Sequence, residues 1–132
     1  TRIPVYVSHF PAGTSSMNIL HWVQLVKAGI AVRFNYGEEM NIATYGQKTP
    51  PTYDFRNISN VPIYVFAGGN DWIADEEDLE NYLLPQIRSQ VQLDKRLPEY
   101  NHFDFIWGLR AAADVYKPIT DLIQENFQRQ GV

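Results

Sequence analysis

The sequence predicts an α/β protein in which parallel strands are covered by helices. From residue 61 onward the chain alternates strand and helix patterns twice, an order that is typical of parallel strands joined by crossover helices. The run VPIYVF at 61–66 is continuously apolar, which favours a strand buried on both faces. Two strands alone cannot bury such a run, so we expect the chain to form the end of a larger α/β domain.

Residues 1–57 have a different, irregular pattern. Two extended pieces are predicted, IPVYV at 3–7 and AVRFNY at 31–36. A Pro-rich loop, KTPPTYDFRN at 48–57, closes this part of the chain. The contrast in texture indicates two regions that meet near residue 57.

One helix is predicted within the first region. Thr14 or Ser15 suits its N-cap, because a side-chain oxygen there can accept a free backbone N–H of the first turn. Gly29 suits its end, where a left-handed residue is common. The apolar residues between them recur at helical spacing and form one face: Ile19, Leu20, Val23 and Val26.

The second region opens with the strand at 61–66 and a turn. Gly68 and Gly69 permit a sharp exit from this strand. A helix is expected from about Asp75, because acidic residues in its first turn suit the positive end of the helix dipole. Pro85 is expected to stop that helix. VQLDKRL at 91–97 alternates apolar and polar residues and predicts a second strand, nearer a sheet edge.

The last helix has a wide apolar stripe. Pro118 interrupts it, so we expect either a kink or a restart that Asp114 caps. The stripe residues, spaced three and four apart, are Phe105, Leu109, Ala112, Tyr116, Ile119, Ile123 and Phe127.

Composition argues against several classes of function. The formal charge is −4 and the Lys and Arg residues are scattered, so a nucleic-acid partner is not expected. No apolar run is long enough to cross a bilayer, and TRIPVYVSHF lacks the apolar core of a signal peptide. The chain has no Cys, and His9 and His21 have no partner at ligand spacing, so a metal site is not expected.

Two polar residues follow the two predicted strands. Asp71 comes after 61–66 and His102 after 91–97, so parallel pairing would bring both to the carboxyl edge of the sheet, where chemistry gathers in open α/β proteins. An aspartate there can accept the Nδ1 proton of the histidine, which leaves Nε2 free to take a proton from a hydroxyl nucleophile. The order Asp then His matches the end of the Ser, Asp, His order of α/β-hydrolases.

Spacing alone leaves other interpretations open. His102 can equally be a loop histidine whose hydrogen bonds are satisfied. Other carboxylates compete for the orienting role, although Asp75 is better explained as a helix cap and Asp104 as a residue that caps or precedes the last helix. Aromatic residues gather around His102, and for Phe105 and Trp107 core packing explains their presence better than a pocket does.

Three stretches of the chain carry a specific resemblance. They are HFPAGTSSMNILHW (9–22), NVPIYVFAGGNDWIAD (60–75) and PEYNHFDFIWG (98–108). In this order and with these gaps, they closely resemble the C-terminal part of the acid lipase family, the gastric and lysosomal acid lipases. The similarity runs from about residue 2 to 123.

The resemblance implies both a fold and an activity. Asp71 corresponds to the acid and His102 to the base of a Ser-His-Asp catalytic triad. Residues 58–132 correspond to the C-terminal part of an α/β-hydrolase core, and residues 1–57 to the end of a cap that overlies the active site. The implied reaction is hydrolysis of neutral lipid esters, triacylglycerol or cholesteryl ester, at a lipid–water interface. It needs no metal or organic cofactor, and the implied location is secreted or lysosomal.

The chain departs from the family in one decisive respect. The G-x-S-x-G sequence that carries the nucleophilic serine is absent from these residues. We therefore expect the N-terminal half of the same protein to supply that serine, and the chain alone to be inactive. Trp72 also stands where the resemblance to mammalian members implies a smaller aliphatic residue, and Glu99 where it implies an apolar residue near the histidine. These departures leave the chain-length and pocket preferences open, but not the reaction class.

The alternative function is a truncated, non-catalytic relative that binds lipid or protein. Cap residues that could touch lipid are Phe10, Trp22 and Tyr36, although simple packing explains each of them as well. The tripeptide N-I-S at 57–59 matches the N-glycosylation acceptor sequence, which is consistent with a glycoprotein of the secretory pathway.

Overall fold

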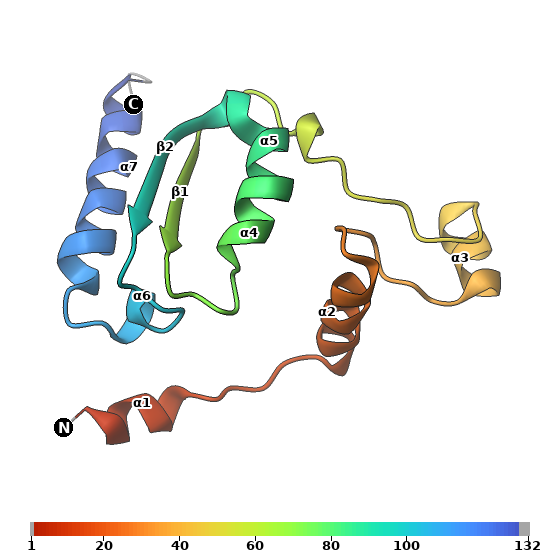
Figure 1. The fold of residues 1–132 in the computed structure, drawn as a ribbon, viewed down its shortest axis with the longest axis horizontal. Coiled ribbons are helices and arrows are strands. Elements are labelled where there is room, and N and C mark those ends of the chain that lie inside the picture. The colour runs from red at the N-terminus through yellow and green to blue at the C-terminus, as the bar shows by residue number, and fades with distance from the viewer. Residues whose placement is uncertain (1, 130–132) are drawn as a thin grey trace. The chain divides into compact units, whose positions relative to one another are not determined.

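The structure, a computed structural model, describes residues 2–129. Its contacts divide the chain into two compact units, Thr1–Asn57 and Ile58–Val132. Figure 1 shows the first unit to be helical, whereas the second contains both strands. No helix among the described residues is long and apolar enough to span a bilayer. The assignment of these regions to a cap and a hydrolase core stays a prediction.

Two parallel strands, β1 (Ile63–Gly68) and β2 (Val91–Leu97), form the centre of the second unit. Gly68 pairs with Leu97 at their carboxyl ends. The prediction of parallel strands with flanking helices is confirmed at this level, and β2 has the predicted bounds. β1 begins two residues later than predicted, because Pro62 has no N–H to donate to a strand ladder.

One helical segment connects β1 to β2. It consists of α4 (Glu76–Asp78), a π-helical turn (Leu79–Leu83) and α5 (Leu84–Ile87). Asp75 caps its start as predicted, because its side chain accepts a backbone N–H of the first turn. The prediction that Pro85 stops the helix is wrong. Pro85 lies in the first turn of α5, after the wider π-helical turn, and the helix continues past it.

The C-terminal helix differs from the prediction in where it breaks. A short helix, α6 (Asp104–Trp107), is separated from a π-helical turn (Ala112–Tyr116) that runs directly into α7 (Lys117–Arg129). Pro118 is in the first turn of α7, which continues directly from the π-helical turn, so the helix does not restart there. Asp114 lies inside the π-helical turn and not at a helix start, so its predicted capping role is also wrong.

The strand pair is covered by helices on both sides. Figure 1 shows α7 on one side of the strands and the α4–α5 segment on the other. Apolar residues from β1, β2 and the segments after them form one cluster, which confirms the packing role predicted for Phe105. The members of this cluster are Phe66, Leu97, Tyr100, Phe105 and Val115.

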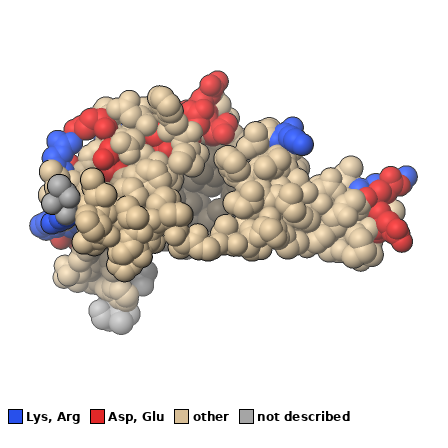
Figure 2. Space-filling model, turned by 90° about the horizontal axis from the view of Figure 1, so that it is seen from below, with Lys and Arg blue, Asp and Glu red and all other residues tan. Residues whose placement is uncertain are grey.

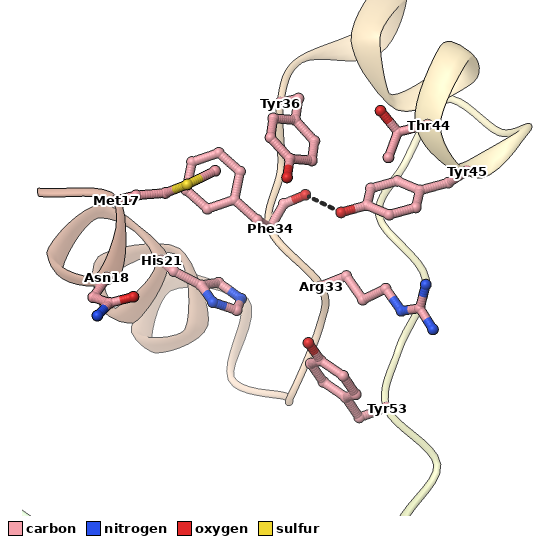
Figure 3. Close-up of a pocket in the computed structure, with 9 residues that line it drawn as sticks. All are labelled: Met17, Asn18, His21, Arg33, Phe34, Tyr36, Thr44, Tyr45 and Tyr53. Atoms are coloured by element: carbon pink, nitrogen blue, oxygen red, sulfur yellow. Dashed lines mark hydrogen bonds between the residues drawn. The ribbon is translucent and has the colours of Figure 1, made fainter. Parts of the chain in front are cut away.

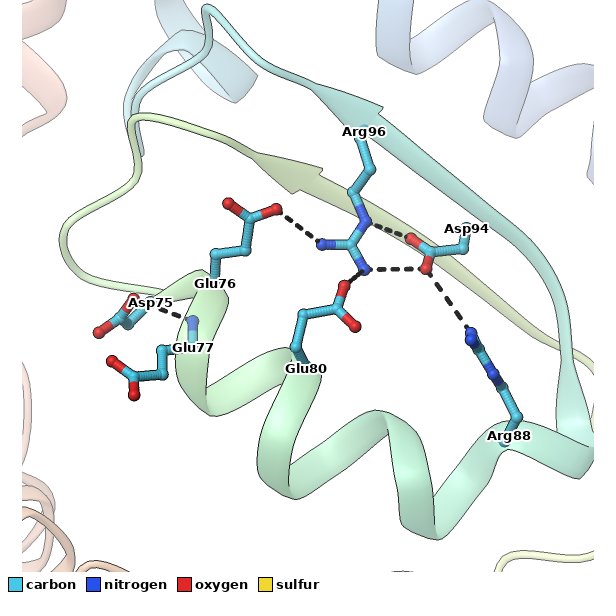
Figure 4. Close-up of polar contacts among 7 residues, drawn as sticks. All are labelled: Asp75, Glu76, Glu77, Glu80, Arg88, Asp94 and Arg96. Atoms are coloured by element: carbon cyan, nitrogen blue, oxygen red, sulfur yellow. Dashed lines mark hydrogen bonds and ion pairs between the residues drawn. The ribbon is translucent and has the colours of Figure 1, made fainter.

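A network of charged residues ties β2 to the α4–α5 segment (Figure 4). The Arg96 guanidinium donates to Asp94 at 2.5 Å and 2.8 Å, and it pairs with Glu76 at 3.2 Å and Glu80 at 2.5 Å. The hydrogen bond from Arg96 lowers the pKa of Asp94, and it outweighs the opposing effect of burial. The pKa of Arg96 is raised by the same hydrogen bond. Each charge therefore has partners that offset its partial desolvation.

In the first unit, α2 (Ser16–Ala28) is the helix that the sequence predicted. The Ser15 side chain accepts the N–H of Met17 at 3.1 Å, which selects Ser15 over Thr14 as the N-cap. Gly29 follows the helix with a left-handed φ of 64°. A further helix, α3 (Glu38–Tyr45), was not predicted.

Both extended pieces predicted in the first unit need correction. Residues 3–7 lie in a helix, α1 (Ile3–His9), whose proline near the start suits a helix N-terminus and outweighs the β-branched residues around it. Residues 31–36 form no regular strand. Their one bridge pairs Val32 with Thr52 in the antiparallel sense.

A buried asparagine organises the loop on either side of α3. Asn41 is only 1% exposed. Its Oδ1 accepts the N–H of Tyr36 at 3.0 Å, while its Nδ2 donates to Asn35 Oδ1 at 2.8 Å and to the carbonyl of Lys48 at 2.9 Å. One side chain thus joins the segments before and after the helix.

Candidate active site

The loops that follow β1 and β2 bring Asp71 and His102 together. Because the strands are parallel, both loops leave the same edge of the sheet. His102 Nδ1 lies 3.0 Å from Asp71 Oδ2, within the distance range of a hydrogen bond. The predicted contact between these two side chains is therefore confirmed, whereas their catalytic role stays a prediction.

Asp71 is a buried carboxylate whose oxygens are both occupied. Only 9% of the residue is exposed. Oδ1 accepts the N–H groups of Ile73 and Ala74, each at 2.9 Å, and Oδ2 faces His102. Burial acts to raise the pKa of Asp71, but these N–H groups and His102 together hold it below its ordinary value. The carboxylate is therefore ionised at neutral pH and fixed in orientation.

His102 presents its other ring nitrogen away from Asp71. An ionised carboxylate can only accept, so the hydrogen bond places a proton on Nδ1 and leaves Nε2 with a free lone pair when the ring is neutral. The side chain is 44% exposed, so the ring is accessible. Phe103 packs edge-on against it at 5.6 Å between ring centroids and stacks on Trp107 at 4.7 Å. The pair can accept and return a proton at Nε2.

Backbone contacts fix the two loops to one another. The N–H of Gly69 donates to the carbonyl of Leu97 at 3.1 Å, and the N–H of Asn70 donates to the carbonyl of Tyr100 at 3.0 Å. A Cβ on Gly68 would lie 2.5 Å from that Tyr100 carbonyl oxygen. The glycines predicted to permit a sharp exit thus serve close approach of the two loops.

Tyr100 precedes the loop that carries His102 and anchors this loop to the π-helical turn that contains Asp114. Tyr100 is buried, and its hydroxyl donates to Asp114 Oδ2 at 2.9 Å. The ring of Tyr100 lies in the apolar core. Since Tyr100 also holds Asn70 through its carbonyl, it supports both loops of the candidate site.

The competing carboxylates have other partners. Asp75 caps α4, as predicted. Asp104 begins α6, and its Oδ2 accepts the N–H of Asn101 at 2.8 Å, while Asn101 Oδ1 accepts the N–H of Phe103 at 3.0 Å. Asn101 Oδ1 also accepts the N–H of Asp104 at 3.3 Å, and together these bonds shape the turn that carries His102.

An open hollow of about 440 Å³ adjoins His102. Trp72 is one of its lining residues and is 95% exposed, an unusual state for a tryptophan. Sequence reasoning noted Trp72 only as a departure from a family pattern, although its position beside Asp71 was a usable signal. The lining residues are Asn70, Trp72, Ile73, Asn101, His102 and Phe103.

A second hollow, of about 490 Å³, lies within the first unit (Figure 3). Figure 3 shows aromatic rings from the segment after α2 and from α3 pointing toward one another around it. The Tyr45 hydroxyl donates to the carbonyl of Phe34 at 3.0 Å, and the Arg33 guanidinium lies 5.9 Å from the Tyr45 ring centroid. Of the three cap residues predicted to touch lipid, only Tyr36 lines this hollow.

Charged side chains are few around both hollows. Figure 2 shows the Lys and Arg side chains in small, separate groups and not in one continuous patch. Neither hollow has more than one Lys or Arg side chain in its lining. Both are thus suited to mainly uncharged ligands.

Taken together, the parallel strands and the paired loops define an α/β protein with an acid–base pair at the carboxyl edge of its sheet. No family model matches the chain. The sequence is 46% identical over 96% of its length to Lipase lipl-1 of Caenorhabditis elegans. It is also 42% identical to gastric triacylglycerol lipase of Rattus norvegicus over 96% of its length, and 43% identical to lysosomal acid lipase/cholesteryl ester hydrolase of Macaca fascicularis over 95%.

The chain therefore belongs to the family of the gastric and lysosomal acid lipases, as its resemblance predicted. It spans 31% of the length of each of these three relatives.

Proposed function

We propose that this chain supplies the acid and base of a Ser-His-Asp triad in a lipase with an α/β-hydrolase fold. The observation that carries the proposal is the 3.0 Å contact between His102 Nδ1 and the ionised Asp71 carboxylate at the carboxyl edge of parallel strands. Similarity to acid lipases over 96% of the chain supports the same reaction class. The remainder of the α/β-hydrolase sheet would belong to a longer protein that contains this chain.

The nucleophile in this proposal is a serine of that longer protein. None of the serines of this chain lies in a G-x-S-x-G sequence, and Ser15 already caps α2. The serine Oγ attacks the ester carbonyl carbon while His102 Nε2 takes its proton, and Asp71 stabilises the resulting imidazolium. Collapse of the tetrahedral intermediate breaks the bond to the alkoxide, which takes the proton from Nε2. Water then cleaves the acyl-enzyme by the same sequence of proton transfers.

The substrate class follows from the relatives and from the uncharged hollow beside His102. The names of the relatives specify triacylglycerol and cholesteryl ester, so we infer a neutral lipid ester presented at a lipid–water interface. Residues 1–57 would form the end of the cap over the site, and the protein would be secreted or lysosomal. Asn57 is exposed and can accept N-glycosylation in such a compartment.

The test compares the longer protein with variants of its proposed triad. His102→Ala and Asp71→Asn should each lower kcat for ester hydrolysis by about 10⁴-fold, because the proton shuttle or its orientation is lost. The control His9→Ala changes an exposed histidine at the end of α1 and should leave kcat unchanged. An active His102→Ala protein would refute the triad.

Labelling by a fluorophosphonate separates the roles of the two parts of the protein. The longer protein should be labelled at its serine, and the 132-residue chain alone should be neither labelled nor active, because it lacks that nucleophile. Covalent labelling of the isolated chain that is abolished by replacing one of its own serines would show that the chemistry lies elsewhere.

The aromatic hollow of the first unit favours a second candidate function. A non-catalytic relative could hold an apolar ligand among Phe34, Tyr36 and Tyr45 without cleaving it. In that case a lipid would bind the longer protein, no ester would be hydrolysed, and His102→Ala would not change the affinity. Hydrolysis that depends on His102 decides for the lipase.

A further inference from the structure

Trp72 occupies a position that folding of the second unit alone does not explain. Its ring contributes nothing to the apolar core and is 95% exposed. The backbone on either side is nevertheless held, because the next two N–H groups, those of Ile73 and Ala74, both donate to Asp71 Oδ1. The same carboxylate that orients His102 therefore also fixes the loop that carries Trp72.

The hollow beside His102 has a chemically defined role if the proposed triad is correct. In acyl transfer, the imidazolium Nε2 returns its proton to the oxygen of the departing alcohol, so that oxygen must lie within hydrogen-bond reach of His102. Groups next to the ring, on the side away from Asp71, then face the alcohol part of the ester. Trp72, Ile73 and Phe103 line the hollow together with His102 itself.

We propose that Trp72, with Ile73 and Phe103, binds the alcohol part of the ester substrate and sets the enzyme's preference for bulky, apolar alcohols. This inference rests on the proposed lipase function. The hollow measures about 440 Å³ and its lining carries no Lys, Arg, Asp or Glu. A volume in the range of roughly 300–1,000 Å³ suits a small-molecule group, and an uncharged aromatic wall suits a neutral glyceride or sterol. The acyl chain would occupy a different part of the full site.

The test uses the longer protein and two series of esters. In the first series the acyl group is held constant and the alcohol is methanol, a diacylglycerol or cholesterol. In the second series the alcohol is constant and the acyl chain lengthens. Trp72→Ala should lower kcat/KM for the bulky-alcohol esters relative to the methyl ester by about tenfold or more, because an apolar contact is lost. Trp72→Phe, which keeps an aromatic face, should lose less.

Single-turnover kinetics sharpen the assignment. Esters with the same acyl group give the same acyl-enzyme once the alcohol has left, so Trp72→Ala should slow acylation and leave deacylation unchanged. The matched control is Leu109→Ala, which truncates another apolar residue of the second unit that is 90% exposed but lies outside this hollow. It should change neither selectivity ratio.

Three outcomes would overturn the proposal. A change in acyl-length preference with an unchanged alcohol preference would place the acyl chain in the hollow instead. Unchanged preferences in both Trp72→Ala and Trp72→Phe would show that the ring does not contact the alcohol. An equal shift in Leu109→Ala would make the effect non-specific. Activity that survives His102→Ala would refute the proposed triad. Activity that requires His102 but does not change in Trp72→Ala would refute only the role of Trp72.

Discussion

The two units of the chain are stabilised in different ways. In the second unit, side chains from β1, β2 and the segments after them share an apolar cluster. In the first unit, α1 and α2 bury no residue among those described, and the most buried side chain is the polar Asn41. The second unit thus depends on removing apolar surface from water, and the first on hydrogen bonds that close its loops.

This difference shows that an apolar face in the sequence does not by itself predict burial. The apolar face predicted for α2 is present in sequence, but its residues Ile19, Leu20 and Val26 are exposed in the structure. Its helix is defined by its caps, Ser15 and Gly29. A stripe of apolar residues therefore indicates a surface that can be buried, and the contacts available decide whether it is.

The largest expected effect comes from truncating the core of the second unit. Leu84 is 2% exposed, so Leu84→Ala should lower the free energy of unfolding by about 2–5 kcal/mol. Val26→Ala in the first unit removes an exposed side chain and should cost less than about 0.5 kcal/mol. Chemical denaturation of the 132-residue chain, for which these exposed fractions hold, measures both. Equal losses would abolish the distinction between the units.

The next effect tests the polar centre of the first unit. Asn41→Ala should cost about 2–3 kcal/mol, because it removes the partners of several buried polar groups at once. Asn18→Ala, which removes one exposed hydrogen bond to Thr14, is the control. Amide hydrogen exchange should accelerate at Tyr36 in the first variant only. Unaltered exchange there would mean that Asn41 does not organise the loop.

The third effect concerns the contact between the two loops of the candidate site. Gly68→Ala places a Cβ 2.5 Å from the Tyr100 carbonyl oxygen, so we expect a loss of about 1–3 kcal/mol in stability as the loops separate. Activity should fall with it, because the Asp71–His102 distance would increase. Gly13→Ala, whose Cβ meets nothing within 4 Å, should be neutral. Wild-type activity in Gly68→Ala would show that the close approach is dispensable.

The smallest effect is a dependence of stability on pH. The pKa of Asp94 is lower in the folded protein, mainly through Arg96, so its stabilising contribution is complete above its unfolded pKa of about 3.9 and is lost as pH falls through the lower folded pKa. Asp94→Asn should therefore destabilise the protein by about 1 kcal/mol near pH 6, and by less at pH 3. Asp121→Asn, in an exposed pair with Lys117, is the control. A difference that grows toward acid would contradict this sign.

Local signals predicted the elements whose ends are fixed by neighbouring residues. Ser15, Gly29 and Asp75 cap helices where the sequence placed them, because a cap needs only a side chain or a left-handed residue beside free backbone groups. The strand at 91–97 was likewise predicted with its observed bounds. Its alternation of apolar and polar residues matches a strand whose two faces differ.

Proline positions were misjudged because their effect depends on the surrounding helix. Pro85 and Pro118 both lie in first turns that follow π-helical turns, where the missing N–H is tolerated. Residues 3–7 were predicted as extended from β-branched content, although a proline near the start also suits a helix. The π-helical turns decided the outcome at Pro85 and Pro118, and the proline near the helix start decided it for residues 3–7.

For the candidate site too, the sequence determined some features and the tertiary structure determined others. Strand order alone determined that Asp71 and His102 follow parallel strands and share one edge of the sheet. Tertiary structure decided the 3.0 Å contact between them, the burial of Tyr100 in the core and the exposure of Trp72 beside His102. Order along a chain fixes which edge a loop occupies. The direction of a side chain within that loop depends on hydrogen bonds and contacts from segments distant in sequence, which no local pattern encodes.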